Sequence, residues 1–292
     1  MKIAVYSRVL EEEKRGDVQL FFDELEKHNI KAVVFLPYLE QIKDRIRLPE
    51  SVTSFYLSED LNNDIDHVVS LGGDGTLLDT VTLVKDKSIP IVGINFGRLG
   101  FLAGIGQDQL KEAVKSIANQ TFIIDKRTLI HLDANISLFD HTPFALNEFA
   151  IHKRDTDSMI KIHTYLNGEF LNTYWADGVI VSTPTGSTGY SLSCNGPILF
   201  PDSGSFVITP VAPHHLNVRS LVVPDTHIIS FEVESRSDEI ICTLDSRKER
   251  VSKNVQIALK KENFSINLLR LKENSFFQSL HNKLTWGVDK RN

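Results

Sequence analysis

The sequence predicts an α/β domain with a Rossmann-like parallel sheet, followed by an all-β domain of the β-sandwich type. Up to residue 120, short apolar runs alternate with amphipathic helical segments, and this βαβα rhythm is typical of a parallel sheet covered by helices. From residue 121 to 271, short alternating runs separated by turn residues indicate antiparallel strands. Helical spacing returns in residues 272–292, and we expect this terminal helix to pack back on the first domain.

The composition sets limits on the class of protein. With 292 residues, of which 41% are hydrophobic and 24% charged, the chain suits a soluble globular protein of one large or two ordinary domains. A net charge of −6 argues against a general affinity for nucleic acid or anionic membranes. No apolar run approaches the ~20 residues that span a bilayer. Cys194 and Cys242 form neither a metal motif nor a disulfide framework. Their rarity fits a reducing cytoplasm, and we expect a cytoplasmic protein. Because Arg8 interrupts the first apolar run, we expect a strand there and no signal peptide.

The elements of the first domain follow from runs of apolar residues and from their spacing. Apolar residues recur at helical spacing from Val18 to Leu25, and Pro37 ends the second strand. In chain order we expect strand Lys2–Ser7, helix Asp17–His28, strands Lys31–Leu36, Ser54–Leu57 and Asp66–Leu71, helix Gly75–Lys85, strand Pro90–Asn95 and helix Asp108–Asn119.

The second domain is predicted from alternating runs. The dipeptide Asn167-Gly168 between two such runs is a strong hairpin signal. After the last strand, Ser275 to Trp286 has helical spacing through Phe276, Phe277, Leu280 and Leu284. The expected strands are Ile160–Leu166, Val179–Ser182, His227–Val233, Glu239–Leu244, Val255–Leu259 and Ile266–Leu271.

A glycine-rich loop, Gly72-Gly73-Asp74-Gly75-Thr76, joins a buried strand to a helix. Ligands of open α/β sheets bind at the carboxyl ends of strands, and glycines let an anion approach the N–H groups of the loop and helix. A carboxylate beside a bound phosphate requires either a metal ion or a proton to be moved. Asp74 is therefore a candidate catalytic residue, and the alternative is that it caps the following helix.

Three further polar segments stand beside expected strands. They are the turn Gly93–Phe101, the pair Asn147-Glu148, and Trp175–Gly178 with the hydroxyl-rich run Ser182–Ser193. Hydroxyls both donate and accept, so this run suits sugars and phosphates, although each segment alone could be an ordinary turn or strand start. Neither a P-loop motif nor a Gly-x-Gly-x-x-Gly motif after the first strand is present.

Taken together and in this order, the motifs resemble those of the NAD kinase family. They are Gly72-Gly73-Asp74-Gly75-Thr76, Asn95-x-Gly97-Arg98-Leu99-Gly100-Phe101-Leu102, Asn147-Glu148, Asp177-Gly178 and Ser182-Thr183-Pro184-Thr185-Gly186-Ser187-Thr188-x-Tyr190-Ser191-Leu192-Ser193. The match covers nearly the whole chain. The run Thr183–Thr188 is the most specific of these motifs. The glycine-aspartate loop is less specific, because diacylglycerol and sphingosine kinases have a similar loop. The resemblance implies an α/β catalytic-loop domain, a β-rich NAD-binding domain with the dinucleotide bound between them, and a homodimer or homotetramer in which one subunit can complete its neighbour's site.

The resemblance also implies a reaction and a set of site residues. ATP would donate its γ-phosphoryl group to the 2′-hydroxyl of the adenosine ribose of NAD, with Mg²⁺ or another divalent metal arriving on ATP and no metal site in the protein. Asp74 would accept the hydroxyl proton, and the amides of Gly72, Gly73, Gly75 and Thr76 would hold phosphates. Asn147 and Glu148 would hold the ribose and adenine region, and Asp177 would face the nicotinamide end. The remaining implied NAD contacts are Phe101, Trp175, Thr185, Thr188, Gly189, Tyr190, Ser191, Leu192, Ser193, Ala212 and Asp245.

Two departures from the family pattern and two alternative functions accompany this hypothesis. Gly189 stands where the family more often has Ala, which should loosen the turn without removing a contact group. Trp175 stands where several relatives carry a basic residue, which bears on contacts to a phosphate or to NADP as a feedback ligand. A lipid kinase of the diacylglycerol or sphingosine type would not need the Thr183–Thr188 run and would need a membrane-binding segment. A non-catalytic dinucleotide sensor would not need Asp74.

Overall fold

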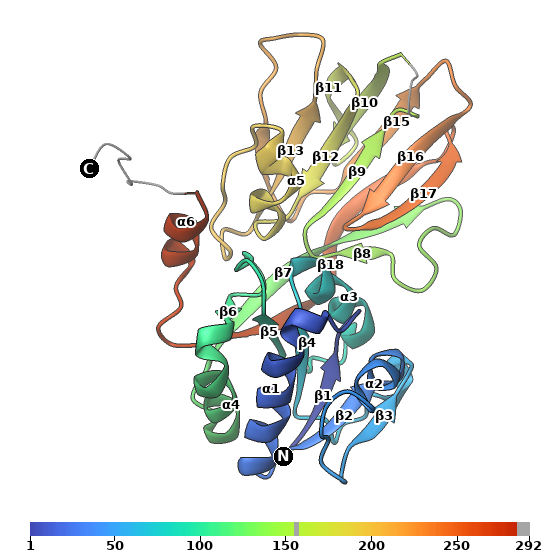
Figure 1. Cartoon of the computed structure of the whole chain (residues 1–292). Helices are drawn as coiled ribbons and strands as arrows, with labels where there is room; N and C mark the ends of the chain where they lie inside the picture. The colour runs from blue at the N-terminus through green and yellow to red at the C-terminus, as the bar shows by residue number, and fades with distance from the viewer. Residues whose placement is uncertain (155–157, 285–292) are drawn as a thin grey trace. The chain divides into compact units, whose positions relative to one another are not determined.

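The computed structural model of the chain describes residues 1–154 and 158–284 (Figure 1). The chain forms two compact units, one of Met1–Lys126 with Ile266–Asn292 and one of Arg127–Ser265. The boundaries between the units differ from those expected at residues 120 and 271. Each boundary lies inside a long strand, one in β7 (Ile123–Ala134) and the other in β18 (Ile257–Arg270). The expected tail beyond residue 284, including Trp286, lies outside the described residues.

The first unit is built on a parallel sheet in the order β18-β5-β4-β1-β2-β3. The chain passes outward from β1 to β3 and then returns to β4, on the other side of β1. The strand order therefore reverses between β1 and β4, which is where open α/β sheets bind ligands at their carboxyl ends. The strands are β1 (Lys2–Tyr6), β2 (Lys31–Phe35), β3 (Thr53–Phe55), β4 (His67–Leu71), β5 (Ile91–Asn95) and the short β6 (Ile105–Gly106) beside β5.

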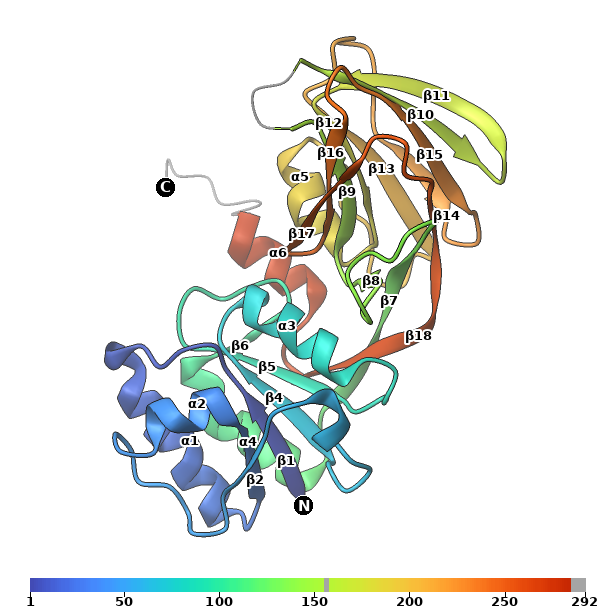
Figure 2. The ribbon, with the colours of Figure 1, turned by 90° about the vertical axis from the view of Figure 1, so that its right-hand side faces the viewer.

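Helices cover both faces of this sheet (Figures 1 and 2). Alternate strand residues such as Val92 and Ile94 form one core with α1, α2 and α4. Gly93 faces the other way, and a Cβ on it would lie 2.7 Å from Leu77 Cδ1 of α3, so glycine lets α3 pack closely. The helices of this unit are α1 (Arg15–Lys27), α2 (Leu36–Ile42), α3 (Asp74–Val84), α4 (Leu110–Asn119) and α6 (Phe276–Leu284), with 3₁₀ turns η1 (Glu12–Lys14), η2 (Ser58–Asp60) and η3 (Gln107–Gln109).

Helix α2 is a feature that the sequence reasoning missed. Pro37 ends the preceding strand, as expected, but it also lies in the first turn of α2. A proline is favourable there because its missing N–H has no intrahelical acceptor. Tyr38 and Ile42 then anchor the short helix in the core.

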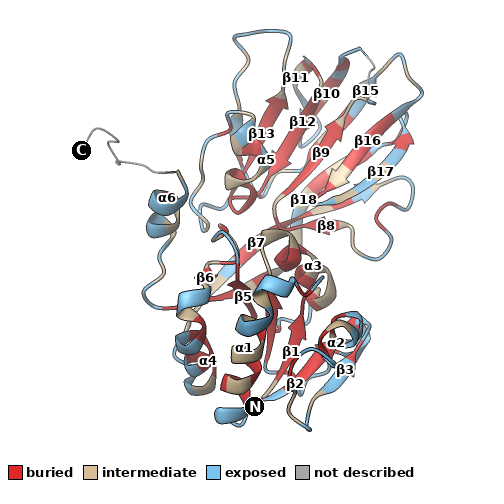
Figure 3. Cartoon of the chain, in the orientation of Figure 1, coloured by how far each residue is buried: buried red, intermediate tan, exposed pale blue. Residues whose placement is uncertain are grey.

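The second unit is a sandwich of two antiparallel sheets. One has the order β11-β10-β15-β18 and the other β14-β13-β12-β9-β16-β17. Their facing residues form a single core, in which Ile162 and Phe231 of one sheet join Phe149 and Val181 of the other, and buried residues mark the same strands in Figure 3. The elements are β8 (Phe144–Ala145), β9 (Glu148–His152), β10 (Ile160–Leu166), β11 (Glu169–Ala176), β12 (Gly178–Ser182), η4 (Gly186–Thr188), α5 (Tyr190–Ser193), β13 (Ser205–Val211), β14 (Leu221–Pro224), β15 (Ile229–Glu234), β16 (Glu239–Leu244) and β17 (Arg247–Ser252).

The fold class predicted from the sequence is confirmed. The hairpin at Asn167-Gly168 has φ values of 50° and 84°, as a turn between two twisted strands requires. One prediction was wrong in detail, because the expected strands Val255–Leu259 and Ile266–Leu271 are parts of the single strand β18. Residues 260–265 between them, which are polar apart from Phe264, stay extended, with exposure that alternates along much of the segment. None of the helices in the described part of the chain is long and apolar enough to cross a membrane.

Candidate functional site

The glycine loop lies at the carboxyl end of β4, at the reversal of strand order. Gly72 has φ 150°, and a Cβ on it would overlap Thr76 Oγ1, so the turn requires glycine there. Gly72 N–H donates to Ile94 O at 2.9 Å and Thr76 N–H to Gly73 O at 3.0 Å. The first N–H groups of a helix have no intrahelical acceptors, and in α3 these belong to Asp74 and Gly75. The amides of Gly72 and Thr76, which were expected to hold phosphates, therefore already have acceptors in the protein. The amides around Asp74 are the remaining candidates for phosphate binding.

The carboxylate of Asp74 accepts three backbone N–H groups from one loop. Oδ2 accepts from Phe101 at 2.9 Å, and Oδ1 accepts from Leu102 at 3.1 Å and from Ala103 at 2.9 Å. The N-cap of α3 is Gly73, and Asp74 is its first helical residue. The helix-capping alternative for Asp74 is therefore wrong. Because Oδ2 accepts a single N–H, a lone pair on it remains able to take a proton.

Two residues shape the loop that holds Asp74. A Cβ on Gly100 would overlap Asp74 Oδ1, so only glycine lets the loop approach so closely. Asn95, at the end of β5, donates from Nδ2 to Arg98 O at 2.6 Å and accepts from Gly97 N–H at 2.8 Å. A cavity of about 110 Å³ beside this turn is lined in part by Ser7, Lys14, Gly72, Gly73 and Asn95.

Arg8 lies at the carboxyl end of β1, beside the glycine loop. Its guanidinium forms an ion pair with both carboxylate oxygens of Asp79, and its Nη2 donates to Gly75 O at 3.0 Å. Tyr6 Oη also donates to Asp79, at 3.1 Å. Sequence reasoning used Arg8 only as the end of a strand and missed it as a site residue. The signal that could have found it is its place after β1, the strand next to β4.

In the second unit, Asp245 fixes the backbone of the Asn147-Glu148 pair. Its Oδ2 accepts Leu146 N–H at 2.9 Å, and its Oδ1 accepts the N–H groups of Asn147 at 2.8 Å and Glu148 at 3.2 Å. Asp245 itself has a positive φ of 52°. The structure thus uses this carboxylate to shape the segment that precedes β9.

The side chains of this pair have polar atoms without a partner. Asn147 Oδ1 and Glu148 Oε2 are buried and have no hydrogen-bond partner among the described residues. Burial and the nearby charge of Asp245, opposed by Tyr190 N–H, raise the pKa of Glu148 to about 8. An unsatisfied buried polar group costs about 1–3 kcal/mol. A ligand that brings hydroxyl or amine donors would remove that penalty.

Several hydroxyls of the Ser182–Ser193 run form hydrogen bonds within the fold. Thr183 Oγ1 donates to Leu146 O at 2.6 Å, and Ser187 Oγ donates to Pro184 O at 2.6 Å. Ser191 Oγ bonds Thr209 Oγ1 at 2.8 Å, and Thr188 Oγ1 donates to Thr185 O at 3.1 Å. A Cβ on Gly186 would overlap the carbonyl oxygen of Asn147. The run therefore packs on the Asn147 segment, and the hydroxyl density reflects this packing as much as ligand binding.

Other residues of the Ser182–Ser193 run are exposed or contact side chains outside the run. Tyr190 is 40% exposed, and its ring lies 5.6 Å from that of His152. A Cβ on Gly189 would lie 3.1 Å from Glu148 Oε2, so an alanine at this position would crowd the Glu148 carboxyl. Thr185 Oγ1 accepts from Arg127 Nη1 at 3.2 Å, and sequence reasoning missed both Arg127 and His152. Along α5, Leu192 is half-buried and Ser193 is exposed.

Asp177, Trp175 and Ala212 lie at neighbouring ends of β11, β12 and β13. Asp177 forms an ion pair with Lys153 at 2.9 Å, and its N–H donates to Val211 O at 3.0 Å. The indole of Trp175 stacks on His214, with ring centroids 4.2 Å apart. Ala212 has a positive φ of 43°. The structure thus brings these three residues together within the second unit, as it does the Asn147, Thr185 and Tyr190 group.

Comparisons with known proteins identify the family. Residues 8–122 match the model of the ATP-NAD kinase N-terminal domain, and residues 146–271 match that of the ATP-NAD kinase C-terminal domain. An NAD kinase of Cytophaga hutchinsonii is 47% identical, and one of Flavobacterium psychrophilum is 42% identical; each alignment covers 100% of both chains.

Solved structures agree with this result. Yeast NADH kinase complexed with NADH has a TM-score of 0.88 at 22% identity, covering 99% of this chain and 88% of that one, and it is similar in fold. An NAD kinase from Archaeoglobus fulgidus in complex with ATP has a TM-score of 0.76 at 25% identity, covering 98% and 99%. The resemblance to NAD kinases seen in the motifs is confirmed, and the chain belongs to the ATP-NAD kinase family.

Proposed function

We propose that this NAD kinase transfers the γ-phosphoryl group of ATP to the 2′-hydroxyl of the adenosine ribose of NAD, with Asp74 as the proton acceptor. The observation that carries the proposal is the setting of Asp74. Three N–H groups hold its carboxylate at the carboxyl end of β4, next to the open N-terminus of α3. Catalysis of phosphoryl transfer depends mainly on the positioning of the substrates and on the stabilisation of charge.

The chemical step moves one proton and one phosphoryl group. The 2′-oxygen forms a bond to the γ-phosphorus while the bond from that phosphorus to the β–γ bridging oxygen breaks, so that ADP leaves. The hydroxyl proton goes to Asp74 Oδ2, which accepts one N–H and has a lone pair left. A carboxylate is a weak base toward an alcohol, so the proton moves late, as the attacking oxygen loses electron density. Such help contributes roughly 10²–10⁴-fold.

The phosphates of the donor would lie at the start of α3. The amides of Gly73, Asp74 and Gly75 belong to the loop at this helix start, and Arg8, paired with Asp79, fixes the loop by donating to Gly75 O. Among the described residues there is no group of three or more His, Cys, Asp or Glu that could hold a metal ion. We propose that Mg²⁺ or another divalent metal enters as part of the ATP substrate, with phosphate oxygens and water as its main ligands.

The dinucleotide would be recognised mainly by the second unit. Asn147 and Glu148 offer the buried, unpartnered oxygens described above, which suit the donors of a ribose or an adenine. Tyr190 supplies an exposed flat face, and Asp177 would face the nicotinamide end. The wall of this site would include Thr185, Thr188, Gly189, Ser191, Leu192, Ser193, Trp175 and Ala212.

The proposed assembly is a cytoplasmic homodimer or homotetramer that binds neither nucleic acid nor membranes. The formal charge of −6 supports the lack of nucleic-acid binding. Self-association is the expectation that the resemblance to the NAD kinase family implies. Light scattering of the purified protein would give its mass directly, and a monomer at all concentrations would contradict the assembly.

A donor and acceptor panel tests the function. Purified protein is incubated with ATP, other nucleoside triphosphates or polyphosphate, against NAD and NADH, with Mg²⁺ present. We expect NADP from ATP and NAD. Binding of NAD without any product from any donor would support the dinucleotide-sensor alternative instead.

A further inference from the structure

We infer that Asn274 and Gln109 are positioning residues for the loop that holds Asp74. This loop, residues 97–106, is called the Asp74 loop below. The inference rests on the proposed role of Asp74. Asn274 belongs to the segment that follows β18, the last strand of the first unit. This segment thereby contributes to the reaction, although Asn274 lies 200 residues from Asp74 in the sequence.

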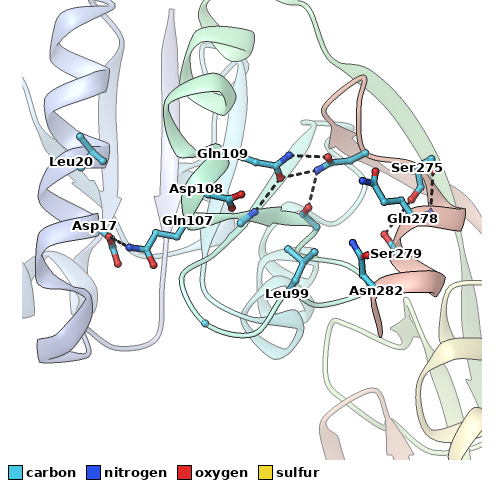
Figure 4. Close-up of a pocket in the computed structure, with 14 residues that line it drawn as sticks. Asp17, Leu20, Leu99, Gln107, Asp108, Gln109, Ser275, Gln278, Ser279 and Asn282 are labelled. Carbon is cyan, nitrogen blue, oxygen red and sulfur yellow. Dashed lines mark hydrogen bonds between the residues drawn. The ribbon is translucent and has the colours of Figure 1, made fainter. Parts of the chain in front are cut away.

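The two side-chain amides hold each other and the end of the Asp74 loop (Figure 4). Asn274 Nδ2 donates to Gly104 O at 2.9 Å and to Gln109 Oε1 at 3.2 Å, while Gln109 Nε2 donates to Asn274 Oδ1 at 3.0 Å. Gln109 Oε1 also accepts Gly106 N–H at 3.4 Å. Gly104 directly follows Ala103, whose N–H binds Asp74. The amide pair therefore acts one residue away from the contact to the carboxylate.

Asn274 is itself attached to the sheet. Its N–H donates to Leu271 O at 3.1 Å, and its carbonyl oxygen accepts from Arg270 Nη1 at 2.8 Å. The end of β18 pairs with β5 through Leu268 and Leu269. The Asn274–Gln109 pair, called the anchor below, is therefore attached to the end of β18, which pairs with β5, the strand that ends at Asn95.

The loop needs this anchor because one of its sides faces a cavity. A space of about 630 Å³ is lined by Gly97, Leu99, Gly104 and Gly106 of the loop and, opposite them, by Asn274 and residues of α6 such as Gln278. Residues that line an open pocket make fewer protein packing contacts on that side. Few apolar contacts and several glycines leave a segment easy to open locally. Hydrogen bonds at its ends then decide how well the three N–H groups stay on Asp74.

Loss of the anchor should change turnover and leave NAD binding unchanged. If the far end of the loop moves, the carboxylate loses the donors that fix its direction, and a misplacement of about 1 Å can slow a reaction by about 10²-fold. The unpartnered oxygens proposed to bind NAD belong to Asn147 and Glu148, which the amide pair does not contact. We therefore expect a lower kcat together with an unchanged Kd for NAD.

The test compares Asn274→Leu and Gln109→Leu with Gln278→Leu, a matched control that removes an amide from the same cavity wall. We expect Asn274→Leu and Gln109→Leu to lower kcat by about tenfold, to leave the Kd for NAD unchanged, and to speed hydrogen exchange of the amides in residues 101–104. The control should change none of the three. Unchanged kcat and exchange in both variants, or equal losses in all three proteins, would overturn the inference.

Two additions keep the outcome clear. Asn274→Asp preserves the shape of the side chain but replaces the Nδ2 donor to Gly104 O by an oxygen, and it serves if the leucine variant does not fold. Hydrogen exchange needs no turnover, so it tests the anchor even if Asp74 is not the proton acceptor. If Asp74→Asn retains full activity, the proposed function of Asp74 fails, whereas normal exchange in Asn274→Asp means that the anchor fails.

Discussion

Asp74 in the first unit and Asp245 in the second each accept three backbone N–H groups with both carboxylate oxygens. Their surroundings differ. Asp74 lies between glycines at the start of a helix, and a loop folds around it. Asp245 lies in the second unit, where burial raises its pKa and where its carboxylate organises the backbone of Asn147 and Glu148.

The comparison shows that one hydrogen-bond pattern can serve two purposes. In the first unit the backbone positions a carboxylate, so that the carboxylate is the functional group. In the second unit the carboxylate positions the backbone, so that the functional groups are neighbouring side chains with unpartnered oxygens. We therefore expect substitutions in the first region to change turnover and substitutions in the second to change the affinity for NAD.

The largest effect is expected for Asp74→Asn. Removal of the proton acceptor should lower kcat by roughly 10²–10⁴-fold and leave the Kd for NAD unchanged. An amide in this position can still accept from Leu102 and Ala103, but its NH₂ group would face Phe101 N–H. Thermal unfolding of the variant should therefore be compared with that of Asp245→Asn, which loses an acceptor in the same way outside the proposed catalytic region. Full activity of Asp74→Asn would show that the proton goes elsewhere.

The next effect concerns the loop around Asp74. A methyl group added by Gly100→Ala would overlap Asp74 Oδ1, so the carboxylate must leave its three donors, and kcat should fall by about 10²-fold. Gly104→Ala is the matched control, because a Cβ there meets no atom within 4 Å. Steady-state kinetics of both variants test this. Equal activity of the two would mean that the close approach of the loop does not matter.

A smaller effect, in the other parameter, is expected for Asn147→Ala. Loss of one hydrogen bond to the ligand should raise the Kd for NAD by about tenfold, which corresponds to about 1.4 kcal/mol. The free energy of unfolding should not fall, because Asn147 Oδ1 has no partner among the described residues. Titration calorimetry and chemical denaturation measure the two quantities. A loss of stability without a change in Kd would assign Asn147 to the fold alone.

The smallest effect concerns the pH dependence of stability. The pKa of Glu148 is raised to about 8, so the folded chain keeps a proton that the unfolded chain loses near its ordinary pKa of about 4.3. The free energy of unfolding should therefore decrease as pH rises through this interval. Glu148→Gln, which stays neutral, should reduce this slope. Denaturation curves at several pH values check it, and identical slopes in wild type and variant would show that Glu148 is ionised when folded.

The sequence predicted the parts of the site that depend on local chemistry. A glycine loop between a buried strand and a helix, and a hairpin at Asn167-Gly168, follow from backbone geometry near one residue. It did not predict that Ala103 binds Asp74, that Leu146 binds Asp245, or that Asn274 binds Gly104 O. These contacts join segments far apart in the chain, and no local pattern marks them.

The role of individual polar residues was the hardest to predict. The hydroxyls of the Ser182–Ser193 run indicated a sugar or phosphate site, yet Thr183, Ser187 and Ser191 bond within the fold. Arg8 had no motif, and it became a site residue only because the sheet places β1 next to β4. A hydrogen-bonding side chain shows from sequence what it can bind, but only the tertiary structure shows which partner it has.

The most direct test measures kcat for NADP formation and the Kd for NAD on wild type, Asp74→Asn and Asn147→Ala in one series. The division between the two regions predicts that Asp74→Asn loses turnover and keeps NAD affinity, while Asn147→Ala loses affinity and keeps most of its turnover at saturating NAD. If both variants change the same parameter, or if Asp74→Asn turns over like wild type, the assignment of proton transfer to Asp74 and of NAD recognition to Asn147 is contradicted.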